Sequence, residues 1–89
     1  MKVIEVEKEI TAHDKARYLH VLREDIGEEA FRIALAKVYT KHLIELKRWK
    51  GKKVVREDIL FFVNMILKEN GCEEVSYSFV KKVEESIAH

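Results

Sequence analysis

Apolar residues recur along most of this chain with the spacing of amphipathic helices. A capping box formed by Thr11 and Asp14 predicts the start of a first helix, and Gly27 is placed to end it. Residues 28–49 are apolar on more than one side, which is typical of a helix that packs on two faces. These residues therefore predict a long central helix ending near Trp49. A second subunit is one source for its second covering surface.

The second half of the chain predicts two shorter helices. From Ile59 onward, apolar residues follow the i, i+3, i+4, i+7, i+8 spacing of an amphipathic helix over residues 56–68. An Asn-Gly pair at 70–71 is a typical signal for the end of that helix. Ser76 is a favourable N-terminal cap and predicts a last helix that follows it directly.

Residues 2–10 show a different pattern. Ile4, Val6 and Ile10 alternate with glutamates, which predicts a half-buried strand. A helix is the alternative, because Val3, Val6 and Ile10 also fit helical spacing. The rest of the sequence contains no second convincing strand, and a lone strand leaves both edges unpaired. We therefore expect the strand to pair with its copy in a second subunit.

The length of the chain predicts one small domain over residues 1–89. The predicted architecture is mainly α, with four helices, a long central helix, an N-terminal β-strand and a dimeric state. Apolar residues make up 47% of the chain, which is normal for a folded protein, but 89 residues bury a small core and favour oligomerisation. Charged residues reach 37%, dominated by Lys and Glu, with few amides. That bias is typical of thermophile proteins.

Several features of the sequence bear on where the protein is located and which cysteine-based sites it can form. No apolar run approaches the roughly 18 residues of a membrane helix, and the N-terminal residues lack the apolar segment of a signal peptide. We therefore expect a cytoplasmic protein that does not bind a membrane. Cys72 is the one cysteine, so a disulfide within the chain and a cysteine-based metal site are excluded.

Charge is concentrated at the junction between the second and third predicted helices. Residues 41–56 hold seven cations and one acid, Glu45, for a net charge of +6. The whole chain carries +1, so the remainder carries −5. A local basic patch on an otherwise acidic chain indicates a defined contact with an anionic partner. The candidate contacts in the basic junction, residues 47–56, are Lys47, Arg48, Lys50, Lys52, Lys53 and Arg56.

These cations predict contact with the phosphates of double-stranded DNA, with little dependence on base sequence. An alternative is a solvated helix end, because the C-terminus of a helix favours cations. A second alternative is a protein-interaction or assembly module whose basic surface meets an acidic partner. Trp49 and Phe61 are then candidate partner-binding residues. Trp49 also fits a role in core packing.

Other polar residues have structural interpretations. His13 and His20 are two helical turns apart, about 10 Å along the axis, which is too far to share one metal ion unaided. His42 lies on an apolar stripe and suits a core or interface position. Glu57 and Asp58 open a predicted helix, where acids stabilise the N-terminus. We predict no catalytic site, metal or cofactor, and therefore no enzyme.

The basic loop and the helix after it resemble a known family. The segment from Lys50 to Val63, with Val54 in the loop and Asp58-Ile59 opening the helix, resembles the second loop and third helix of the histone fold. The resemblance implies an obligate dimer whose loops contact DNA phosphates, here through Lys52, Lys53 and Lys50. Another DNA-binding alternative is a helix-turn-helix made of the last two helices.

Overall fold

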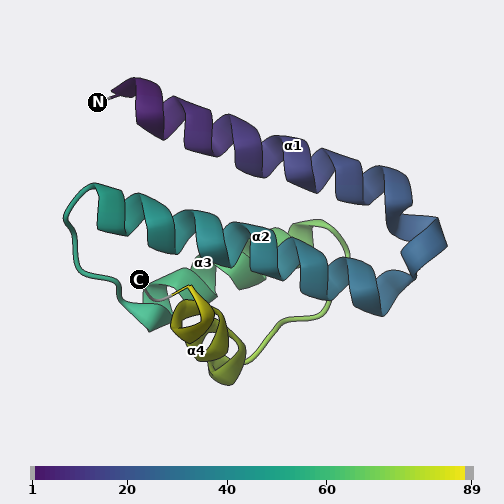
Figure 1. Ribbon diagram of the computed structural model, residues 1–89. Helices are drawn as coiled ribbons and strands as arrows, with labels where there is room; N and C mark the ends of the chain where they lie inside the picture. The colour runs from purple at the N-terminus through teal and green to yellow at the C-terminus, as the bar shows by residue number, and fades with distance from the viewer. Residues whose placement is uncertain (1, 88–89) are drawn as a thin grey trace.

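The structure, a computed structural model, describes the backbone of residues 2–87 and the side chains of residues 12–87. Its elements are four helices, α1 (Lys2–Ile26), α2 (Glu28–Trp49), α3 (Arg56–Glu69) and α4 (Tyr77–Ser86). Helices α1 and α2 form an antiparallel hairpin, and α3 and α4 lie on the other side of α2 (Figure 1). The prediction of a long central helix is confirmed. Its second covering surface comes from α3 and α4 of the same chain.

The strand predicted over residues 2–10 is wrong. Helix α1 runs unbroken from Lys2 to Ile26, and the backbone described over residues 2–87 contains no strand. The helix start predicted at Thr11 is wrong for the same reason, because Thr11 lies inside α1. A lone strand would leave its peptide groups without partners, whereas a helix pairs them within the segment. The argument for a dimer from strand pairing therefore has no basis in this fold.

The hydrophobic core is built around α2. Phe31, Leu35 and Ile44 of this helix are almost completely inaccessible to solvent. The other core residues come from all four helices and the loop before α4: Ala16, Ala36, Ile59, Val63, Leu67, Val75 and Val80. The buried side chains in the described part of α1, residues 12–26, are small, whereas α3 and α4 supply branched aliphatic ones. The apolar periodicity of α2, α3 and α4 therefore marks the buried face in outline, although Phe62, on the apolar stripe of α3, is 48% exposed.

Three of the predicted local signals at the helix ends are confirmed. Gly27 separates α1 from α2, and Asn70 caps the C-terminus of α3. The hydroxyl of Ser76 accepts a hydrogen bond from the backbone N–H of Phe79 at 3.4 Å, which makes Ser76 the N-cap of α4. These signals act within a few residues, so they are readable without knowledge of the tertiary fold.

Side chains from three helices hold the loop between α3 and α4. The backbone N–H of Val75 donates to Oδ1 of Asn64 at 2.8 Å, and Nδ2 of Asn64 donates to the Val75 carbonyl at 3.2 Å. Arg32 of α2 donates to the carbonyl of Glu74 at 2.9 Å, and Arg23 of α1 donates to that of Asn70 at 3.1 Å. The loop is thus fixed by side-chain hydrogen bonds and has a defined position.

We expect Asn64→Ala to destabilise the protein by about 1–2 kcal/mol, because both polar backbone groups of buried Val75 would lose their partner. Urea unfolding measures the effect. Asn64→Asp is the matched control, since it keeps the acceptor for the Val75 N–H and loses the donor. A cost below about 0.5 kcal/mol for Asn64→Ala would mean that water replaces the amide.

Candidate functional site: a lysine-bordered groove

A tight turn at the C-terminus of α2 sets the position of the basic junction. The backbone N–H of Lys52 donates to the carbonyl of Lys47 at 2.9 Å, and that of Gly51 donates to the carbonyl of Arg48 at 3.0 Å. This pair of bonds is the Schellman motif, and Gly51 has the left-handed φ of 69° that the motif requires. The turn brings Lys52 back beside the last turn of α2.

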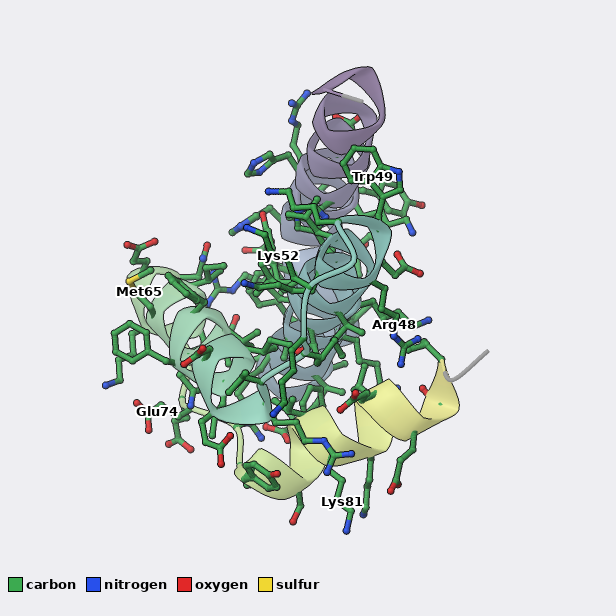
Figure 2. All side chains as sticks on the ribbon, turned by 90° about the vertical axis from the view of Figure 1, so that its left-hand side faces the viewer. Arg48, Trp49, Lys52, Met65, Glu74 and Lys81 are labelled. Carbon is green, nitrogen blue, oxygen red and sulfur yellow. The ribbon has the colours of Figure 1, made fainter. Side chains whose placement is uncertain are left out.

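Two of the six predicted contact residues form bonds to other groups of the same chain. Nε of Arg56 donates to Oε1 of Glu84 at 2.6 Å, and Arg48 lies 4.0 Å from Oε2 of the same carboxylate. Arg48 also donates to the carbonyl of Ile87 at 3.0 Å, and its side chain lies toward the end of α4 (Figure 2). Hydrogen bonding to Glu84 raises the pKa of Arg56. Arg48 and Arg56 therefore join α2 and α3 to α4.

The remaining cations divide into two groups. Lys47, Lys50 and Lys52 line a groove between the C-terminal part of α2 and the N-terminal part of α3. Lys53 lies in a second hollow, with Arg56 and Tyr77, at the N-terminus of α4. The structure thus brings three of the predicted residues together and separates the other three from them.

The floor of the groove is apolar. Leu43 and Leu46 of α2 face Ile59 and Phe62 of α3, and the space between them is about 250 Å³. One acid, Asp58, shares the lining with the three lysines, so the groove carries a net charge of +2 at neutral pH. The volume lies below the roughly 300–1,000 Å³ of most small-molecule sites. A groove of this size and character suits a few apolar side chains beside acidic groups.

An exposed apolar strip continues from this groove along α3. Phe62 is 48% exposed, Met65 is 42% exposed and Phe61 is 67% exposed. The two phenylalanine rings pack edge to face, with centroids 5.6 Å apart. Met65 lies on the outer side of α3 (Figure 2). Clustered aromatic residues and methionine on a surface are typical of protein interfaces.

The predicted partner-binding residues have different positions relative to the groove. Phe61 lies on the exposed strip beside Phe62. Trp49 is half-buried at the last turn of α2 and is not among the core residues that the described side chains form. Leu43 and Leu46 could not be predicted as groove residues from sequence, because their helical spacing is the same as that of buried core residues.

The histidines and the acids at 57–58 occupy separate places. His13 is hydrogen-bonded to the hydroxyl of Tyr39 at 3.2 Å, and His20 packs edge to face on Phe31. Glu57 and Asp58 lie in the first turn of α3, where they favourably meet the helix dipole. Within the part of the chain that the structure describes, no cluster of three His, Cys, Asp or Glu side chains is placed to hold a metal ion.

No family model, no curated protein and no solved structure matches this chain. Among the described residues, none of the helices combines the length and the apolar character needed to span a bilayer.

Proposed function

We propose that this protein is a helical interaction module that binds an acidic amphipathic helix of a partner protein in the groove between α2 and α3. The observation that carries the proposal is an apolar floor bordered by three lysines. A docked helix would bury apolar side chains against Leu43, Leu46 and Phe62, as in other helix-in-groove complexes. Its flanking carboxylates would meet Lys47 and Lys52.

The charge of the groove specifies the partner. Lysines at the rim of an interface raise the association rate of an acidic partner and disfavour a basic one. The apolar floor supplies most of the affinity, because aromatic and aliphatic anchors near the centre of an interface dominate its energy. The partner helix is therefore expected to carry apolar residues at i, i+3, i+4 and i+7, with Glu or Asp beside them.

A second candidate function is sequence-independent binding of double-stranded DNA, which the resemblance to the histone fold suggests. Its support is the exposure of Lys52 and Lys53, which are adjacent in the α2–α3 loop and form no ion pair among the described residues. Two observations favour the protein partner. Arg56 is paired with Glu84 and Arg48 is hydrogen-bonded to the Ile87 carbonyl, so neither is free for phosphate. The groove also has an apolar floor, which contributes nothing to phosphate contacts.

The test uses a designed 18-residue helical peptide with leucines at i, i+3, i+4 and i+7 and glutamates beside them. We expect this peptide to bind with a Kd of about 1–100 μM, and the same peptide with lysines in place of glutamates to bind at least tenfold more weakly. Fluorescence anisotropy gives the affinities. Amide shifts in NMR spectra should concentrate around Leu43, Leu46 and Phe62.

Variants locate the binding surface. Phe62→Ala and Lys52→Glu should each weaken binding of the acidic peptide by about tenfold. Tyr18→Ala is the matched control, because Tyr18 is an aromatic residue of α1 with 64% exposure and lies outside the groove. Equal binding of the acidic and basic peptides would contradict the proposal. So would a labelled random duplex that binds, weakens at least tenfold from about 50 to 200 mM salt and ignores Phe62→Ala.

A further inference from the structure

The connection between α1 and α2 is a single residue with an unusual backbone conformation. Gly27 has φ 90° and ψ 161°, a region of backbone space that is essentially restricted to glycine. A Cβ atom at this position would meet nothing within 4 Å. Glycine is therefore required for its backbone conformation and not for lack of space. This one residue reverses the chain direction between helices of 25 and 22 residues.

Helix α1 is attached to the rest of the protein mainly through α2. Among the described residues, α1 packs on α2 and on no other helix. The contacts include the His13–Tyr39 hydrogen bond and the ring of Phe31, which His20 meets at 5.0 Å. The guanidinium of Arg23 lies 4.3 Å above the same ring. These contacts join side chains on either side of the hinge, so the same set would form with α2 of another copy. The hydrogen bond from Arg23 to the Asn70 carbonyl would then also be made to the other copy.

We propose that two copies of this chain exchange α1. In the exchanged dimer Gly27 is helical, α1 and α2 form one continuous helix, and α1 of each copy packs on α2 of its partner. At 1.5 Å per residue the continuous helix over residues 2–49 is about 72 Å long. Two such helices run antiparallel about a twofold axis near Gly27. The interface is isologous, as in most soluble homodimers.

The monomer and the exchanged dimer share nearly all their contacts, so their balance depends on the hinge and on concentration. Glycine is less favourable than alanine in a helix because it loses more backbone entropy, so a helical Gly27 has a cost that favours the hairpin. Four acids, Glu24, Asp25, Glu28 and Glu29, lie within three residues of the hinge in each copy, and two of them are ion-paired, Glu28 with Arg23 and Glu29 with Arg32. Their repulsion across the axis also opposes the dimer, and salt screens it. The exchanged dimer should therefore increase with protein concentration and with ionic strength.

Substitution of the hinge residue tests the exchange directly. Gly27→Ala removes the cost of the straight helix and makes the hairpin conformation unfavourable. We expect this variant to be dimeric by light scattering at about 50 μM, with a wild-type helix content by circular dichroism. Gly71→Ala is the matched control, because Gly71 also has a positive φ, of 73°, and open space around its Cα. It lies between α3 and α4 and should stay monomeric at the same concentration.

Cross-linking distinguishes exchange from another mode of dimerisation. Cysteines replacing His13 and Tyr39, in a Cys72→Ser background, are joined by a short bis-maleimide. In the Gly27→Ala dimer these cross-links should connect two chains on a denaturing gel. A folded, monomeric Gly27→Ala variant, or a dimer with cross-links within each chain, would overturn the proposal.

The same pair in the protein with Gly27 intact keeps the test decisive if Gly27→Ala does not fold. Cross-links between chains should rise several-fold from about 10 μM to 1 mM protein, and further in 1 M salt. Cross-links confined within single chains at both concentrations would contradict the exchange. The peptide-binding groove contains no residue of α1, so loss of exchange leaves the proposed function intact, and loss of peptide binding leaves the exchange intact.

Discussion

Phe31→Ala should destabilise the protein by about 3–5 kcal/mol, a large part of the stability of a domain of this size. Phe31 is completely buried in α2, and its ring belongs to the core cluster. The same ring contacts α1, through His20 and through the guanidinium of Arg23. Its removal would leave a cavity in the core and weaken the attachment of α1 at the same time.

Urea unfolding followed by circular dichroism measures this loss. Phe31→Leu is the first control, because it keeps most of the buried volume and removes the aromatic contacts with α1. Arg23→Gln is the second, since it removes the cation above the ring and the ion pair with Glu28 while the core stays filled. If Phe31→Ala cost less than about 1.5 kcal/mol, the packing around α2 would have to close over the cavity, which tightly packed interiors rarely do.

The limits of α2, α3 and α4 were predictable because their signals are local. Gly27, Asn70 and Ser76 act on the backbone within a few residues, and the apolar spacing of each helix repeats over several turns. The segment at residues 2–10 has no such clarity. Its apolar positions fit both the period of two of a strand and the period of three to four of a helix. Only the lack of a second strand to pair with favours the helix.

The basic junction shows what a sequence pattern leaves open. Six cations within ten residues suggest one continuous surface. However, Arg56 is hydrogen-bonded to Glu84, 28 positions later, and Arg48 is hydrogen-bonded to the carbonyl of Ile87. The groove depends on the way α2 and α3 lie beside each other, which leaves Phe62 half-exposed while Ile59, three residues earlier, is buried. Helix periodicity gives both residues an apolar role. Their different exposure comes from tertiary packing.

A second consequence of packing concerns Thr40, and Thr40→Val should stabilise the protein by about 1–3 kcal/mol. Thr40 is completely buried in the middle of α2, and its hydroxyl has no hydrogen-bond partner among the described side chains and backbone. Burial of an unpaired hydroxyl costs free energy because its bonds to water are lost without replacement. Valine has nearly the same shape and a similar helix propensity, so the core stays filled and only this cost disappears.

Thermal unfolding should show this gain as a higher Tm, by about 4–8 °C for each kcal/mol in a domain of this length. Thr40→Ser is the matched control, because it retains the hydroxyl, removes the buried methyl group and should lower the stability. A Thr40→Val variant less stable than the parent protein would contradict the assignment. It would mean that the hydroxyl donates to a backbone carbonyl of the preceding helical turn, a bond that threonine in a helix forms readily. The single buried polar side chain among the described residues would then support α2 instead of weakening it.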